Sequence, residues 1–201
     1  MKKKNEERIE QILQSLKTLK FATRRQLQGI HSLGGIRNAQ RLLKSLVEME
    51  LLSVTKWTNE HVYYLSKNGA SYVGTNPMKK SIQIDHHLLR NEAWMMSGLP
   101  KWDIEKPITF SSSNGDKKQI IPDARFKADT LYCIEIDRKQ SMVRNRKKME
   151  LYGILNELFY IKNQKKIVLR IYTTLNSRKI LFENLAGEHG VVCEVYVLDD
   201  I

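Results

Sequence analysis

Acidic side chains gather in a short stretch of the second half of the chain. Asp123 follows a proline, and Glu135 and Asp137 come twelve and fourteen residues later. Residues two apart on a strand share a face, so Glu135, Asp137 and Lys139 are expected to project together. If the strand that carries Asp123 pairs with this one, Asp123 joins the same face. Clustered carboxylates suit Mg²⁺ or Mn²⁺, which can hold a scissile phosphate and activate a water molecule.

This pattern resembles the PD-(D/E)XK nuclease superfamily, which places an Asp after a Pro on one strand and an acidic-x-Lys triplet on the next. The resemblance implies catalytic roles for Asp123 and Glu135. It also implies a Glu on the preceding helix, matched here by Glu92. The implied metal ligands are therefore Glu92, Asp123, Glu135 and Asp137, with Mg²⁺ or Mn²⁺ as the cofactor.

The lysine of the superfamily motif is displaced in this chain. If Glu135 is the acidic member, Asp137 occupies the lysine position; if Asp137 is the acidic member, Lys139 fits and the register moves by two residues. Some superfamily members carry the lysine on the following helix, where Lys147 or Lys148 would serve. A carboxylate beside an anionic transition state opposes catalysis, so we expect nuclease activity to be low or absent.

A plainer interpretation of the same cluster is also open. The carboxylates would then be strand-end charges that are solvated or paired with Arg125 and Arg138.

The elements that must position these residues follow an αβββαβαβ order in the second half. Hydrophobic periodicity predicts helices over 82–98, 142–161 and 177–188, and strands over 102–110, 119–126, 131–137, 166–172 and 191–198. The order αβββαβ is similar to the core of the PD-(D/E)XK superfamily.

The first half predicts three helices followed by a hairpin. Apolar residues at helical spacing mark 9–19, Thr23 can cap a helix over 24–30, and a third helix follows the turn at 31–35. In the third helix, Ile36 and the apolar residues at 39, 42, 43, 46 and 47 are expected to face inward. Two β-like runs, 51–57 and 61–65, flank a short turn. This is the winged-helix order.

Basic and amide side chains line the outward side of this first half. Residues 1–73 hold thirteen Lys and Arg against six Asp and Glu, and the whole chain carries a formal charge of +12 with a pI near 9.7. Such a charge attracts polyanions, so duplex DNA is the expected partner. The expected DNA-binding residues are Arg24, Arg25, Arg37, Asn38, Gln40, Arg41, Lys44 and Lys56.

Turn residues at 74–77 predict the linker between two domains. The predicted fold class is α+β: a winged helix-turn-helix domain over 1–75, and an α/β PD-(D/E)XK, restriction-endonuclease-like domain over 76–201. No run of 18 apolar residues occurs, and Cys133 and Cys193 lack metal-site spacing and are predicted to be reduced core thiols. We therefore expect a cytoplasmic protein without a membrane span.

Taken together, the winged helix, the run PDARF, the run IEID and a basic helix reaching Lys148 and Tyr152 resemble the replication-relaxation family of plasmids and phages. The resemblance implies a role in replication or DNA relaxation, as a DNA-binding accessory protein, and leaves catalysis open. The displaced lysine predicts that the nuclease-like domain is inactive or weakly active. The expected partners are duplex DNA, plasmid replication or relaxosome proteins, and a second copy of the chain. The alternatives are a Mg²⁺-dependent endonuclease targeted by its winged helix and a transcriptional repressor.

Overall fold

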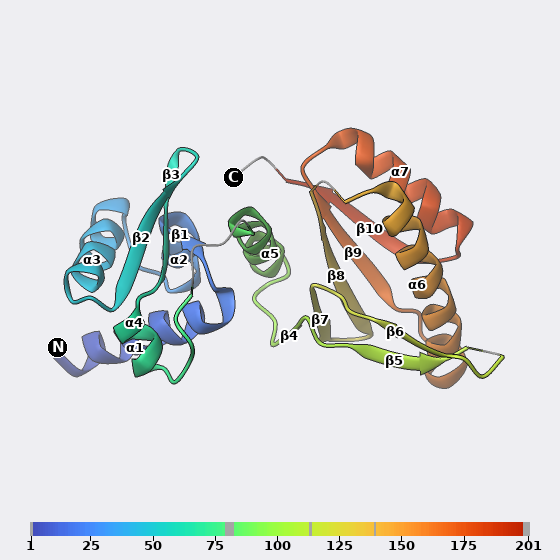
Figure 1. Ribbon diagram of the computed structural model, residues 1–201, viewed down its shortest axis with the longest axis horizontal. Coiled ribbons are helices and arrows are strands. Elements are labelled where there is room, and N and C mark those ends of the chain that lie inside the picture. Colours follow the sequence, from blue (N-terminus) through green and yellow to red (C-terminus); the bar gives the residue numbers. More distant parts are fainter. Residues whose placement is uncertain (1, 79–82, 113, 139, 199–201) are drawn as a thin grey trace. The chain divides into compact units, whose positions relative to one another are not determined.

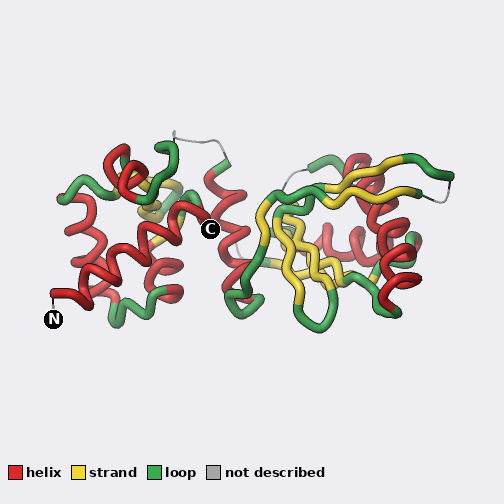
Figure 2. The backbone as a smooth tube through the Cα atoms, turned by 90° about the horizontal axis from the view of Figure 1, so that it is seen from below, coloured by secondary structure: helices red, strands yellow, loops and turns green. Residues whose placement is uncertain are grey.

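The computed structural model describes residues 2–78, 83–112, 114–138 and 140–198. Helices and strands occur in both halves of the chain, so the predicted mixed α+β class is confirmed (Figure 1). The chain forms two compact units, the first ending at Leu99 and the second beginning at Pro100. Helices dominate the first unit, and most strands belong to the second (Figure 2).

The first unit combines helices with a small antiparallel sheet. Its elements are α1 (Lys2–Leu19), β1 (Ala22–Thr23), α2 (Arg24–Ile30), α3 (Ile36–Glu48), β2 (Leu52–Trp57), β3 (Glu60–Leu65), α4 (Lys67–Tyr72) and α5 (Ile84–Met96). The strands lie in the order β1-β3-β2, and the hairpin of β2 and β3 matches the predicted one. The two-residue strand β1 has no periodicity to reveal it and was not predicted.

Thr23 fixes the start of α2, as its sequence position predicts. Its hydroxyl accepts a hydrogen bond from the Gln26 backbone N–H at 3.2 Å, and the Gln26 side chain accepts one from the Thr23 N–H at 3.2 Å. This reciprocal capping box satisfies two backbone donors that a helix start leaves open. Because Thr23 also pairs with Val62 of β3, the cap ties α2 to the sheet.

The core of the first unit is formed mainly by α1 and α3. Its fully buried members include Ile12, Leu13, Leu16, Leu19, Ala39, Leu43 and Leu46. The prediction that Ile36 faces inward is wrong, since its side chain is 55% exposed. Ile36 lies in the first turn of α3 and lines an open groove with Gly29, Ser32 and Met95.

Helix α5 packs on the first unit. Leu88 is buried against Phe21 in a small apolar cluster. The Asn91 side chain donates to the Phe21 carbonyl at 2.6 Å, and the Gln26 side chain donates to the Leu88 carbonyl at 2.9 Å. The predicted boundary at 75/76 would assign α5 to the second domain. The contacts of α5 with Phe21 and Gln26 assign it to the first unit.

The second unit is built on a five-stranded sheet with the order β10-β9-β8-β7-β4. Its elements are β4 (Asp103–Ile104), β5 (Ile108–Ser111), β6 (Lys117–Ile120), β7 (Ala124–Lys127), β8 (Leu131–Asp137), α6 (Met142–Asn163), β9 (Val168–Thr173), α7 (Asn176–Glu188) and β10 (Val192–Val197). The strands β8, β9 and β10 are parallel, while β7 is antiparallel to β8. The hairpin of β5 and β6 forms a separate small sheet.

Two predicted strands are each divided in the structure. The strand expected over 102–110 is interrupted before β5, at Pro107, and the strand expected over 119–126 is interrupted at Pro122. Proline lacks the N–H that a strand interior donates, so a strand ends there. At Pro122 the chain leaves the small hairpin and enters the large sheet, which places Asp123 at the corner between them.

Helices α6 and α7 cover one face of the five-stranded sheet (Figure 1). The core between them is lined by Cys133, Met149, Tyr152, Leu169, Ile171, Phe182 and Leu185. Although α6 spans 22 residues, charged side chains recur along it. Within the described ranges, neither α6 nor another helix is long and apolar enough to cross a membrane.

The packing of α5 predicts how far the first unit must extend to be stable. We expect a fragment of residues 1–99 to exceed a fragment of residues 1–75 in free energy of unfolding by about 2–5 kcal/mol, because the shorter one loses the apolar contacts of Leu88 and uncovers Phe21. Urea unfolding followed by circular dichroism measures the difference. Equal stability of the two fragments would show that α5 contributes nothing to this unit.

Candidate functional site

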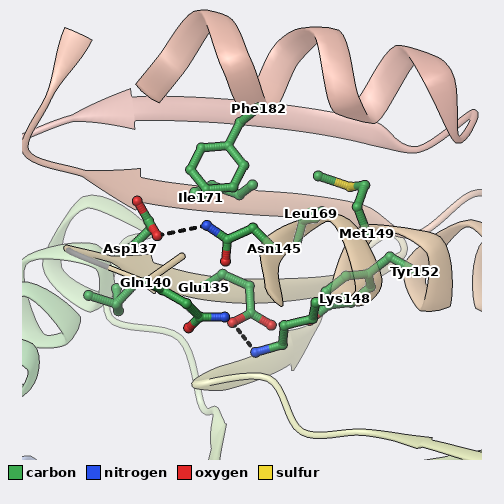
Figure 3. Close-up of a pocket in the computed structure, with 11 residues that line it drawn as sticks. Glu135, Asp137, Gln140, Asn145, Lys148, Met149, Tyr152, Leu169, Ile171 and Phe182 are labelled. Carbon is green, nitrogen blue, oxygen red and sulfur yellow. Dashed lines mark hydrogen bonds and ion pairs between the residues drawn. The ribbon is translucent and has the colours of Figure 1, made fainter. Parts of the chain in front are cut away.

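The centre of the candidate site is Glu135 on the middle strand β8. Its side chain lies on the face that α6 covers, beside a narrow pocket with a cavity volume of about 20 Å³ (Figure 3). A cavity of that volume holds a water molecule and little more. The pocket is lined by Glu135, Asp137, Gln140, Asn145, Lys148, Tyr152 and Phe182, among others.

Both carboxylate oxygens of Glu135 are bound by donors from α6. The Lys148 Nζ lies 2.5 Å from Oε2, and the Tyr152 hydroxyl donates to Oε1 at 2.5 Å. The side chain of Glu135 is only 12% exposed. Burial raises the pKa of Glu135 to about 8; the Lys148 charge acts against this shift and the Asp123 charge adds to it.

The neighbouring hydroxyl and thiol groups stay protonated at neutral pH. Burial, and next the charge of Glu135, raises the pKa of Tyr152 well above its usual value. Burial also raises the pKa of Cys133 to about 12. Because the nucleophilic form of each group is its anion, neither Tyr152 nor Cys133 is prepared to act as a nucleophile.

Asp123 is held beside Glu135 by the pairing of β7 with β8. Its Oδ2 accepts a hydrogen bond from the Ile136 N–H at 2.6 Å, and its own N–H donates to the Ile134 carbonyl at 3.0 Å. Its charge is near enough to raise the pKa of Glu135. The structure thus brings together Asp123, Glu135 and Lys148.

Asp137 is fixed by an ion pair with α7. Arg178 binds both carboxylate oxygens, through Nε to Oδ2 and through Nη2 to Oδ1 at 2.8 Å. The Asn145 side chain donates to Oδ1 at 3.0 Å, and the Asp137 side chain is 5% exposed. Arg178 also donates to the Gln140 carbonyl at 2.7 Å. Through Asn145 of α6 and Arg178 of α7, Asp137 therefore joins the end of β8 to both helices.

Glu92 belongs to the first unit. Its Oε1 accepts hydrogen bonds from Arg25 at 2.7 Å and from Gln26 at 2.6 Å. Among the residues that the structure describes, no group of three or more His, Cys, Asp or Glu is arranged to hold a metal ion. In the second unit, different protein donors bind the side chains of Asp123, Glu135 and Asp137.

The three candidate lysines have different positions. Lys148 of α6 contacts Glu135, whereas the adjacent Lys147 is exposed. Lys139 lies outside the described residues. Of the two described candidates, it is Lys148 that reaches the carboxylates.

Three other polar residues complete the surroundings of Glu135 and Asp137, and sequence reasoning gave none of them a role. Asn145 and Tyr152 lie three residues before and four residues after Lys148, so helical spacing from that lysine could have indicated both. Arg178 lies 41 residues from Asp137 along the chain. No local pattern connects that pair.

The predicted DNA-binding residues of α3 form an exposed basic face. Arg37, Gln40, Arg41 and Lys44 are exposed. Asn38 is half-buried: its amide donates to the Leu33 carbonyl at 2.6 Å, and its side-chain oxygen accepts from Arg41 at 3.0 Å. Four of these five side chains are therefore accessible to a ligand.

The remaining predicted DNA-binding residues surround α3. Lys56 is exposed on β2, and Arg25 is bound to Glu92. Arg24 lines a cleft of about 220 Å³ whose other walls are formed by Gln40, Asn59, Glu60, His61 and Tyr63. The cleft therefore lies between α3 and the β2–β3 hairpin.

The raised pKa of Glu135 predicts a pH effect on stability. A folded-state pKa above the unfolded value means that the folded protein retains a proton which the unfolded chain releases, so the free energy of unfolding falls as pH rises from about 5 to about 8. Glu135→Gln should reduce this slope by at most about 1.4 kcal/mol per pH unit. Urea unfolding at pH 5, 6, 7 and 8 tests it. Glu150→Gln, which alters an exposed carboxylate of α6, is the control; identical slopes in both variants would contradict the prediction.

The buried ion pair of Asp137 and Arg178 is expected to stabilise the fold. Asp137→Ala leaves the Arg178 guanidinium without its carboxylate, which should lower the free energy of unfolding by about 3–5 kcal/mol. Glu188→Ala removes an exposed ion pair with Arg146 and should cost less than about 1 kcal/mol. Equal losses in the two variants, measured by chemical unfolding, would show that Asp137 does not anchor the helices.

Comparison with known proteins gives one match. The model of the replication-relaxation family matches residues 13–169, which include parts of both compact units and the cluster of Asp123, Glu135 and Lys148. No curated protein and no solved structure shows significant similarity to the chain. The match extends over more than half of the sequence and confirms the resemblance to this family that the sequence motifs indicated. The chain belongs to the replication-relaxation family.

Proposed function

We propose that this protein is a DNA-binding accessory of a plasmid or phage that acts in replication or DNA relaxation. The family name supports a role in replication or relaxation of a mobile element. The exposed basic face of α3 is the observation that carries the DNA-binding part of the proposal. The nuclease-like second unit acts in this proposal as a scaffold for DNA or partner contacts.

The first unit has the element order expected of a winged helix-turn-helix domain. In such domains the second helix of the motif enters the major groove and its side chains contact base edges. Here α3 occupies that position in the chain and presents Arg37, Gln40 and Arg41. Arginine can bind guanine through two hydrogen bonds and glutamine can bind adenine in the same manner.

The cleft between α3 and the hairpin suits a phosphate of the DNA backbone. Arg24 supplies a fixed positive charge there, and His61 and Tyr63 supply further polar groups. Glu60 in the same cleft carries the opposite charge and would limit how closely a phosphate approaches. In this arrangement the cleft positions the duplex while α3 contacts its bases.

A Mg²⁺-dependent endonuclease is the second candidate. It is favoured by the proximity of Asp123 and Glu135 and by Lys148, which occupies the helical position that the lysine takes in some PD-(D/E)XK enzymes. Against it, donors from α6 bind both oxygens of Glu135, and Arg178 binds Asp137. The residues present therefore fit a divalent metal poorly.

The α3 proposal predicts a loss of DNA affinity. Replacing both Arg37 and Arg41 with Ala should weaken binding to a duplex that the protein recognises by about 1–3 kcal/mol for each lost base contact. If the two side chains contact phosphates only, the salt dependence of binding should decrease instead. Fluorescence anisotropy of a labelled duplex, recorded between 50 and 200 mM salt (about the range in which such contacts weaken), distinguishes the two effects.

The matched control removes the same charge elsewhere. Lys162 and Lys166 are exposed in the second unit, and replacing both with Ala lowers the net charge equally. We expect this variant to retain most of its affinity. Unchanged affinity and salt dependence in the Arg37→Ala, Arg41→Ala variant would exclude α3 as the DNA-contacting helix.

The occupied carboxylates predict little or no nuclease activity. Supercoiled plasmid incubated with the purified protein and Mg²⁺ or Mn²⁺ should remain supercoiled, because the protein's own donors compete with a metal for Asp123 and Glu135. The same assay with Asp123→Ala and Glu135→Ala provides the controls. Metal-dependent nicking that disappears in both variants would establish the endonuclease and overturn the accessory role of this unit.

A further inference from the structure

Strand β10 forms one edge of the five-stranded sheet. It pairs in parallel with β9, and in the described part of the chain no strand pairs with its other side. The Leu198 N–H donates to the Thr173 carbonyl of β9 at 2.8 Å. Because successive residues of a strand direct their N–H and C=O groups to opposite sides, Val192, Glu194 and Tyr196 also bond with β9. The backbone groups of Cys193, Val195 and Val197 consequently point outward from the sheet.

This edge lacks the features that commonly protect an exposed strand. Edge strands are usually short, or carry Lys, Pro or a bulge, since an open edge is a template for another strand. The opposite edge of the sheet is protected in that way, because β4 has only two residues. By contrast, β10 has six residues with the sequence VCEVYV, and Val192 is 40% exposed.

We propose that β10 pairs with β10 of a second copy of the chain, in antiparallel orientation about a two-fold axis at Val195. In this register Val195 forms a hydrogen-bonded pair with its own equivalent. Cys193 then faces Val197 of the second copy, and the two-fold axis repeats this pair with the two chains exchanged. All three outward-facing residues obtain backbone partners, as antiparallel geometry requires.

The charges near β10 permit this pairing. Glu194 is the one charged residue of β10, and it is bound to Arg170 at 2.6 Å. The proposed register places Glu194 opposite Tyr196 of the second copy, so like charges do not face each other. On α7, Glu183 lies near Cys193: burial raises the pKa of the Cys193 thiol most, and the charge of Glu183 raises it further. Glu183 is itself paired with Lys179.

The proposal does not depend on DNA binding. The chain has a formal charge of +12, but β10 itself carries no Lys or Arg, so positive charges do not face each other across the paired strands. If α3 also binds DNA, the dimer carries two recognition helices related by a two-fold axis. Such a dimer matches DNA sites with two symmetric halves.

Light scattering coupled to size-exclusion chromatography tests the oligomeric state. The full chain should elute as a dimer at micromolar concentration, and Val197→Pro should elute as a monomer. Proline at 197 removes an outward-facing N–H and leaves the bonds between β10 and β9 in place. Ile180→Ser, at a side chain of α7 that is 62% exposed, is the control and should remain a dimer.

A disulfide tests the register and remains informative if the proline variant fails to fold. Val197→Cys places a thiol opposite Cys193 of the second copy, at a Cα–Cα distance of about 5.5 Å, which a disulfide can span. Within one chain the same two positions are about 13 Å apart along the strand, too far to bridge. Mild oxidation should therefore give a covalent dimer.

Mass spectrometry of the linked peptides identifies the bond, and Ile180→Cys, treated in the same way, should give little covalent dimer. A full chain that is monomeric up to high micromolar concentration would overturn the proposal. So would open-ended assemblies, or a dimer that persists in Val197→Pro and does not form the disulfide between positions 193 and 197.

Discussion

Two acidic side chains, Glu135 and Asp137, lie on the face of β8 that α6 and α7 cover, and donors from those helices bind both of them. A buried carboxylate without such a partner costs several kcal/mol. Lys148 and Tyr152 bind Glu135, and Arg178 binds Asp137 through both oxygens. These contacts set the position of α6 and the start of α7 along the strand. The pocket beside Glu135 is the space that remains once those donors are in place.

The two units differ in whether their polar side chains are already bound by other protein groups. In the second unit, the donors that make burial of the carboxylates tolerable compete with any metal ion for the carboxylates, and they are themselves already engaged. In the first unit, the side chains of Arg37 and Gln40 on α3 are exposed. A ligand can therefore reach polar groups of α3 without displacing a buried protein partner. This contrast is the physical reason for assigning DNA binding to the first unit and a scaffold role to the second.

Much of the fold was predictable because local signals agree with the packing. The strand over 131–137 and the helix capped by Thr23 occur at their expected positions. The division of two predicted strands at prolines was missed because their apolar runs continue across the break. The placement of α5 was missed because its apolar residues do not show which neighbour they contact. At the site, spacing located Asp123 and Glu135, whereas Arg178 comes from a distant helix and only tertiary packing reveals it.

In the proposed function, the first unit binds duplex DNA through α3 and the adjacent hairpin. Hydrogen–deuterium exchange of the full chain, with and without saturating duplex at low salt, measures this directly in the unmodified protein. We expect slower exchange in residues 36–48 and 52–65 on DNA addition, with smaller changes over 100–198. Slower exchange confined to residues 100–198, or no change in residues 36–48, would contradict it.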